Sequence, residues 1–435
     1  GGPEQFMRPQ DGSDQKTKKE QIYVVRDDTR FLAATNRIAL GDALAAIDGD
    51  GFERLIESDR AQTMFDQLGD IDAFAMVMLQ DLLQHVMATD QTGMASMFVP
   101  MVTSVVGKID GIGMGMRMNG ASGMVEMPWF AYMPGGKSGL TSLIDSRVDR
   151  DGELPAFVSP QTISYSKMAL KFDSLPGWFE GVVNSNPMLQ MQLQQHMETI
   201  TEALQQLSST LGNEMHSVMT LRRPIEMQSM KQFMAVKCVD SEGFEQFLND
   251  YATEQSGLEP RDFLGYRIYS LDTGMLMPGM PGGPGMGGQT EDVAIGIGGG
   301  YVLLGPASAV EQALRSLSAR DARTLDSDEE YQRAMASFGG DDLSGWGFAR
   351  FVDYFEAQMK VAMLQQKQML ERMQNEFGED FVKHQRKQLE TMREEIEALD
   401  FDQMQRSLGP TIWNMRSTDL GFVGSMNMLR PSSSN

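Results

Sequence analysis

Two stretches of the chain, Phe31–Leu44 (FLAATNRIALGDAL) and Tyr301–Leu314 (YVLLGPASAVEQAL), align with each other without a gap. In each stretch an apolar run is followed by a short turn and then by apolar residues at helical spacing. Both stretches predict a strand that leads into an amphipathic helix. The chain therefore carries the same strand–helix pattern twice.

Three further pairs of segments follow in the same order in both parts of the chain. They are Glu57–Asp70 with Asp326–Asp341, Ala73–Leu83 with Ser344–Phe355, and Met114–Met127 with Trp413–Met426. The first pair predicts a helix with Ser58 or Ser327 as its N-cap, the second a strand that runs into a helix, and the third a β-hairpin. Four ordered blocks indicate a duplication, in which residues 21–133 correspond to residues 292–431.

Residues 134–291 have no earlier counterpart in the chain. The motif Gly-Gly-Pro stands at Gly1–Pro3 and again at Gly282–Pro284, at the same point of the pattern. We therefore expect the second half of one repeat and then a complete second repeat, with the counterpart of residues 134–291 preceding Gly1. The expected domains are a flexible loop remnant (1–20), a half-repeat (21–133), a second repeat (134–347), a helical hairpin (348–407), and a closing β-hairpin with a tail (408–435).

The second repeat alternates strands with helices. We expect a strand pair around Gln161–Phe172, a helix over Asn186–Gly212 with Asn186 as its N-cap, and a hairpin turn at Gly298–Gly300. Further strands are expected at His216–Pro224, Lys231–Val239, Tyr266–Asp272 and Val293–Ile297, and a further helix at Ser241–Gln255. This pattern predicts the α+β fold class, as a tandem repeat of antiparallel sheets covered by helices.

A long helical hairpin is expected near the C-terminus. Phe348–Phe377 and Phe381–Leu399 both show helical spacing, and Gly378–Asp380 interrupts them. An apolar stripe follows the first of these helices: Phe351, Phe355, Met359, Met363, Leu370, Met373 and Phe377. This stripe either accepts a partner helix, as adaptable methionine surfaces do, or packs within the hairpin and onto the sheet.

The net charge and the cysteine content exclude some partners and some covalent cross-links. The 435 residues carry a formal net charge of −23, and 41% of them are hydrophobic. An acidic field repels phosphate backbones, so nucleic acid is not an expected partner. Cys238 is the only cysteine, which excludes a disulfide within the chain, and its apolar surroundings predict a small buried thiol. No apolar run reaches the length that a transmembrane helix needs.

Several blocks together resemble a family of uncharacterised, duplicated α+β bacterial proteins. The blocks are Leu211–Pro224 (LGNEMHSVMTLRRP), Lys231–Tyr251 (KQFMAVKCVDSEGFEQFLNDY), Gly265–Asp272 (GYRIYSLD), Gly298–Leu314 (GGGYVLLGPASAVEQAL) and Asp326–Met335 (DSDEEYQRAM). The resemblance covers most of the chain and includes no catalytic motif. Members of the family typically carry signal sequences, so the resemblance implies an extracytoplasmic location. They usually also carry the half-repeat that this chain lacks before Gly1.

A Met/Gly/Pro-rich stretch contains the candidate metal ligands. Met275, Met277, Met280 and Met286 lie close together within Gly274–Gly288. Thioethers are soft ligands that suit Cu(I), and close spacing is what such a site needs. A plain surface linker explains the same composition, because methionine is abundant throughout this chain.

The remaining motifs indicate structural roles rather than catalytic or ligand-binding sites. Gly111–Met118 alternates like one arm of a hairpin rather than opening a helix, and Ala131–Gly139 lacks the first glycine of a phosphate loop. The histidines are scattered rather than at metal-ligand spacing: His85, His196, His216 and His384. No catalytic residue and no cofactor is predicted. We therefore expect a non-enzymatic binding or scaffolding protein. The alternatives are an enzyme whose site lies at the interface between the repeats, and a copper-binding protein that uses the Met-rich loop.

Overall fold

The computed structural model describes residues 23–26, 31–34, 41, 45, 58–90, 93–118, 124–144, 147–150, 152–251, 258–271, 292–319, 322–337 and 342–431. The chain divides into two compact units, residues 1–69 and 70–435. In the first unit β1 (Tyr23–Arg26) pairs with β2 (Phe31–Ala34), and α2 (Asp59–Leu68) begins after Ser58. The Ser58 hydroxyl accepts a hydrogen bond from the Ala61 N–H, which confirms it as an N-cap.

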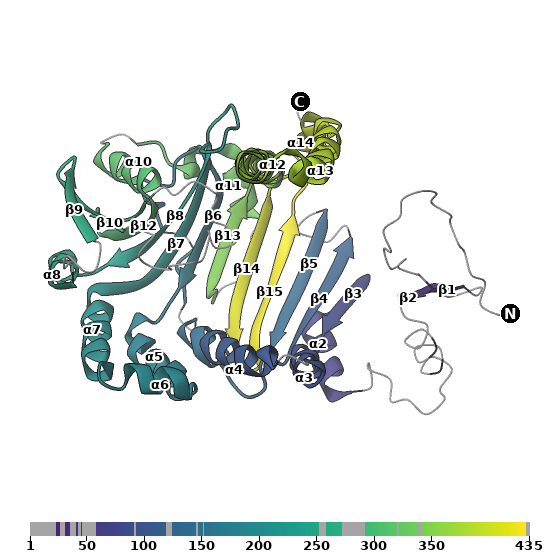
Figure 1. Ribbon diagram of the computed structural model, residues 1–435, viewed down its shortest axis with the longest axis horizontal. Coiled ribbons are helices and arrows are strands. Elements are labelled where there is room, and N and C mark those ends of the chain that lie inside the picture. Colours follow the sequence, from purple (N-terminus) through teal and green to yellow (C-terminus); the bar gives the residue numbers. More distant parts are fainter. Residues whose placement is uncertain are drawn as a thin grey trace. The chain divides into compact units, whose positions relative to one another are not determined.

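The described strands of the second unit form one 13-stranded sheet in which every neighbouring pair is antiparallel (Figure 1). In spatial order the strands are β3 (Ala73–Val77), β4 (Gly111–Met118), β5 (Val125–Tyr132), β15 (Gly421–Met428), β14 (Thr411–Thr418), β13 (Gly345–Ala349), β6 (Thr162–Ala169), β7 (Leu211–Leu221), β8 (Met230–Cys238), β12 (Tyr301–Pro306), β11 (Val293–Gly298), β10 (Tyr266–Leu271) and β9 (Leu258–Phe263). The predicted α+β class with antiparallel strands is confirmed. The strands from both sides of residue 134 belong to a single sheet.

The helices gather at the two ends of the strands as well as on the sheet faces. In chain order they are α3 (Leu79–Thr89), α4 (Met94–Val106), η2 (Gly139–Leu143), η3 (Phe172–Ser174), α5 (Leu175–Asn184), α6 (Pro187–Leu193), α7 (Met197–Thr210), α8 (Ser241–Tyr251), α10 (Ala307–Ser318), η4 (Leu325–Ser327), α11 (Glu329–Ala336), α12 (Phe351–Phe377), α13 (Glu379–Glu397) and α14 (Phe401–Ser407). Helices α12, α13 and α14 lie at one end of the central strands, and α4 lies at the other end (Figure 1).

Helices cover both faces of the sheet near β12. Leu303 of β12 is fully buried in the same cluster as Val310 and Leu314 of α10. The preceding residue, Val302, is buried in a second cluster with Phe244 of α8. Because successive side chains of a strand point to opposite faces, α10 and α8 lie on opposite faces. Each fully buried side chain of this kind contributes about 1.5–3 kcal/mol.

Three local expectations differ from the structure. The helix predicted over Asn186–Gly212 is two helices, and β7 already begins at Leu211. Gly212 does not end a helix but lies in β7, where an added Cβ would come 2.9 Å from Cγ of Lys237. Asn186 is confirmed as a cap, because its Oδ1 accepts from the Leu189 N–H.

The other two differences concern a strand and a cap. The strand pair expected around Gln161–Phe172 is one strand, β6, because Phe172 begins the η3 turn. Asp328 rather than Ser327 caps α11, since the Asp328 carboxylate accepts from the Tyr331 N–H and the Ser327 hydroxyl donates to the Thr324 carbonyl.

Two tryptophans lie over glycines of neighbouring strands. An added Cβ at Gly347 in β13 would meet the indole of Trp413, with Cε2 at 2.6 Å. An added Cβ at Gly424 in β15 would come 2.7 Å from Cε2 of Trp129. These glycines therefore make room for aromatic rings that lie against the sheet.

We expect Gly347→Ala to lower the free energy of unfolding by about 1–3 kcal/mol, because the Trp413 ring has to move out of its packed position. Urea denaturation followed by tryptophan fluorescence measures the change. Gly177→Ala in α5 is the matched control, because an added Cβ there meets nothing within 4 Å. Equal stability of the Gly347→Ala variant and the control would contradict this account of the glycine.

Candidate functional site

The side chains of β4 divide between the two faces of the sheet. Met114, Met116 and Met118 alternate along the strand with Gly113 and Gly115. Strand β4 pairs with β5 in antiparallel register, which confirms that Gly111–Met118 is an arm of a hairpin. The three methionines therefore stand in a row on one face of the sheet.

The strand register extends this row across two further strands. Met114 lies opposite Trp129 of β5, so both side chains occupy the same face. The next pairing places Met127 of β5 opposite Met426 of β15. One residue set thus shares a face on three neighbouring strands, and we call it the methionine face: Met114, Met116, Met118, Met127, Met426 and Met428.

Much of the methionine face is accessible to solvent. Met114, Met116, Met118 and Met426 keep 47%, 38%, 50% and 37% of their surface exposed. Exposed apolar residues that stand singly are ordinary, whereas a contiguous group of them marks an interaction surface. Methionine is flexible and polarisable, so such a surface adapts to partners of different shape.

Two half-buried tryptophans adjoin the methionine face. Trp129 lies over Gly424, and Trp413 lies over Gly347, on the face to which the methionines also point. Helices α4 and α12 lie near opposite ends of β14 (Figure 1). None of the residues named for the methionine face carries an ionisable group.

A second candidate site is a buried polar cluster on the other face of the sheet. The Tyr165 hydroxyl lies 2.9 Å from Nδ1 of His216, and Nε2 of His216 lies 3.8 Å from Oε2 of Glu214. The Lys167 ammonium forms an ion pair with Glu214 at 3.1 Å and donates to the Asp149 carbonyl at 3.0 Å. Residues from β6 and β7 and one residue of the loop before β6 meet here.

The electrostatics of this cluster keep His216 uncharged. Burial lowers the pKa of His216 to about 3, and the positive charges of Lys167 and Lys237 act in the same direction. Burial likewise raises the pKa of Tyr165 well above its ordinary value. Only 1% of His216 is exposed, and aromatic rings of Phe157, Tyr165 and Tyr301 surround it. A neutral, enclosed imidazole suits a packing role and has no access to a substrate.

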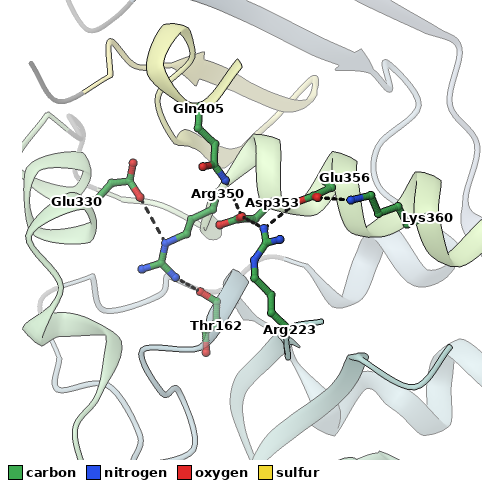
Figure 2. A network of polar contacts seen from close by, with 8 residues as sticks. All are labelled: Thr162, Arg223, Glu330, Arg350, Asp353, Glu356, Lys360 and Gln405. Atoms are coloured by element: carbon green, nitrogen blue, oxygen red, sulfur yellow. Dashed lines mark hydrogen bonds and ion pairs between the residues drawn. The ribbon is translucent and has the colours of Figure 1, made fainter. Parts of the chain in front are cut away.

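A third group of polar residues fastens α11 and α12 to the end of β6 (Figure 2). The Arg350 guanidinium donates to the Thr162 carbonyl at 2.6 Å and to the Pro160 carbonyl at 3.1 Å. It also pairs with the carboxylates of Asp328 at 2.8 Å and Glu330 at 3.4 Å. Its donors are therefore engaged by the protein itself and are not available to an anionic ligand.

Arg223 plays a similar part beside the first turns of α12 (Figure 2). It lies 2.7 Å from a carboxylate oxygen of Asp353 and 2.7 Å from one of Glu356. Lys360 approaches the other oxygen of Glu356 at 2.6 Å. Burial alone raises the pKa of the Glu356 carboxyl, but hydrogen bonds from Arg223 and Lys360 outweigh it and leave the pKa below its ordinary value.

The residues that the sequence singled out as candidate ligands lie in different parts of the chain. Met275, Met277, Met280 and Met286 lie outside the described residues. His85 is exposed on α3, His196 precedes α7, His216 is buried in β7, and His384 belongs to α13. The described part of the chain contains no cluster of His, Cys, Asp and Glu that could hold a metal ion. Cys238 is buried, as expected.

The sequence did not single out the His216 cluster. A usable signal is present, because Tyr165 and Lys167 on β6, and Glu214 and His216 on β7, are each two residues apart and therefore share a face. The pairing that brings Lys167 opposite His216 is set by the register of two strands, which alternation alone does not supply.

No protein-family model, no curated protein and no solved structure matches the chain. Among the described helices, none combines the length and the apolar character that crossing a membrane requires.

The buried histidine makes stability depend on pH. Between pH 6.5 and about 3, the unfolded chain binds a proton at His216 that the folded protein does not bind. The free energy of unfolding therefore falls as the pH decreases through this range, by about 1.4 kcal/mol per pH unit from this residue. His216→Asn should reduce the slope by that amount, as measured by urea denaturation at several pH values between about 4 and 6. The exposed substitution His85→Asn controls for the change of residue type, and an unaltered slope in His216→Asn would exclude this role.

Removing Arg223 should destabilise the α12 attachment. We expect Arg223→Met to lower the free energy of unfolding by about 1–3 kcal/mol, because the largely buried Glu356 carboxylate loses one of its two cationic partners. The double variant Arg223→Met/Glu356→Met should recover part of the loss. A double-mutant cycle by urea denaturation gives the coupling energy of the pair. A cycle that closes with no coupling would show that the ion pair adds nothing.

Proposed function

We propose that this protein is a non-enzymatic binding protein and that the methionine face is its contact surface. The observation that supports this most directly is the register that gathers exposed methionines of β4 and β15 on one face. His216, at the centre of the buried polar cluster, is only 1% exposed. Binding through an exposed apolar face needs no catalytic group.

The partner that fits this surface best is the apolar side of a basic amphipathic helix. Methionine side chains repack around apolar residues of varied shape, which suits the irregular side of a helix. The net charge of −23 attracts a partner whose flanking residues are lysine or arginine. The proposal includes an extracytoplasmic location, which rests on the family resemblance.

We also propose that the chain is duplicated, as its sequence blocks predict. The pairing of β3 with β4 places Ala73 opposite Met116, and the pairing of β13 with β14 places Gly345 opposite Met415. Met116 and Met415 are equivalent in the alignment of Met114–Met127 with Trp413–Met426. The same backbone hydrogen bond precedes both strands: Asp72 N–H to the Met116 carbonyl, and Ser344 N–H to the Met415 carbonyl, each 2.8 Å.

The pairing of β5 with β15, where the two copies meet, also supports the proposed duplication. Met127 and Met426 are equivalent in the alignment and also lie directly opposite each other in the β5–β15 pair. A pairing in which equivalent residues face each other is the mark of two-fold symmetry. The two hairpins β4–β5 and β14–β15 are thus related by a pseudo-two-fold axis between Met127 and Met426.

The helices α12 and α13 are the second candidate surface. The described residues of the predicted apolar stripe, such as Phe355 and Leu370, are half-buried or buried, which favours packing within the protein. Met369 and Met392 nevertheless keep 54% and 38% of their surface exposed. A partner helix on α12 and α13 is therefore the alternative that the binding experiment has to separate.

The test is a titration of a dansyl-labelled leucine–lysine amphipathic peptide against the full chain. We expect Met114→Ser/Met116→Ser/Met118→Ser to weaken binding by about tenfold or more, because three exposed apolar contacts are lost. The matched control Met369→Ser/Met392→Ser removes exposed methionines of α12 and α13 and should leave the affinity unchanged. Circular dichroism verifies that both variants remain folded.

The two variants give opposite results under the two hypotheses. Loss of affinity in the Met369→Ser/Met392→Ser variant alone would show that the peptide binds to α12 and α13 and not to the methionine face. Unchanged affinity in both variants, or absence of peptide binding to the unaltered chain, would overturn the proposed function.

A further inference from the structure

In the part of the chain that the structure describes, β3 is the last strand at one side of the sheet. Among the described strands, β3 pairs with β4 and has no neighbour on its other side. Ala73, Ala75 and Val77, which share the face of the exposed methionines, are themselves exposed. An edge strand presents unpaired N–H and carbonyl groups and is a template for a further strand.

The strand equivalent to β3 is not at an edge. Strand β13 pairs with β14 on one side and with β6 on the other. If the duplication proposed above holds, Ala73 and Ala75 of β3 are equivalent to Gly345 and Gly347 of β13. The partner that β13 already has therefore shows which kind of strand the β3 edge is built to accept.

Small residues at these positions are consistent with a close neighbour. On β13, Gly345 lies opposite Met168 and Gly347 opposite Ser166 of β6. A Cβ added to Gly345 would come 3.1 Å from Cγ of Met168, so the neighbouring side chain reaches over the strand. The two corresponding residues of β3, Ala73 and Ala75, also have short side chains.

We infer that the outer edge of β3 accepts an antiparallel strand of the β6 type, with Ala75 opposite the position of Ser166. The occupant is a segment that alternates as Thr162–Ala169 does, with bulky residues such as Tyr165 on one face and Ser164, Ser166 and Met168 on the other. It belongs to a first-half repeat like residues 134–291. Such a strand adds a methionine beside Ala73 and so widens the methionine face.

A pairing of two β3 edges from two copies of the chain is the competing arrangement. Nothing equivalent to it occurs at β13, whose outer neighbour is β6. The register seen at β13 therefore favours the β6-type strand, and self-pairing becomes an outcome of the experiment.

Disulfide trapping tests both the occupant and its register. The full chain carries Ala75→Cys in a Cys238→Ser background, so that the engineered thiol is the only one. The probe is a synthetic peptide of Gln161–Phe172 that carries Ser166→Cys, mixed with the chain in a glutathione redox buffer. Directly opposite residues lie within reach of a disulfide. The control peptide carries Lys167→Cys instead, which points to the other face.

We expect the Ser166→Cys peptide to cross-link at least about tenfold faster than the Lys167→Cys peptide, because only its thiol shares a face with Cys at position 75. A second pair, Ala73→Cys with a Met168→Cys peptide, should behave in the same way if the register is that of β13. Equal rates for the two peptides, or no cross-link above that of a scrambled peptide, would overturn the inference. A disulfide-linked dimer of the Ala75→Cys chain that the peptide does not suppress would overturn it in favour of self-pairing.

This inference rests on the proposed duplication but not on the proposed partner helix. The cross-linking experiment tests strand pairing at the edge of β3, whereas the dansyl-peptide titration tests binding to the exposed methionines of β4. Each result therefore stands or fails without the other.

Discussion

The pairing of β5 with β15 is the interaction on which the architecture depends. Eight consecutive residue pairs join the hairpin of residues 111–132 to the hairpin of residues 411–428, although the two are far apart in sequence. A shift of one residue in this register would turn every side chain of one hairpin to the opposite face. The continuity of the sheet and the assembly of the methionine face both follow from this one set of backbone hydrogen bonds.

The two faces of the central sheet have different chemistry. One face carries thioethers and indoles, with glycines at positions where an indole lies flat against a neighbouring strand. The other carries a closed core, in which the Tyr165 ring stacks on His216 and meets Trp346 in a T-shaped contact. Burial and the nearby lysine charges keep the His216 imidazole of that core uncharged rather than reactive. The exposed face is the one to which we assign the proposed contact surface.

Local patterns in the sequence predicted much of the fold. Alternation over Met114–Met127 and Trp413–Met426 predicted two hairpins, and the hydroxyl of Ser58 and the amide of Asn186 were correctly expected as caps. These features depend on residues that are close in sequence, and their physical causes act locally. The helix predicted up to Gly212 was wrong because helical spacing of the apolar residues continues into β7, where pairing with β8 decides the backbone conformation. The same limit applies to the candidate site, since alternation shows that Met114 and Met116 share a face but not that β15 lies beyond β5.

Exposed thioethers have a consequence for oxidative chemistry. Peroxide converts methionine to its sulfoxide, which replaces a flexible apolar side chain with a polar one. Met114, Met116, Met118 and Met426 are open to this reagent, whereas Met415, on the same face but buried under its neighbours, is shielded. Oxidation would therefore change the hydration of β4 and β15 while leaving the buried cluster of Met415 in place, and reductase repair would restore the apolar surface.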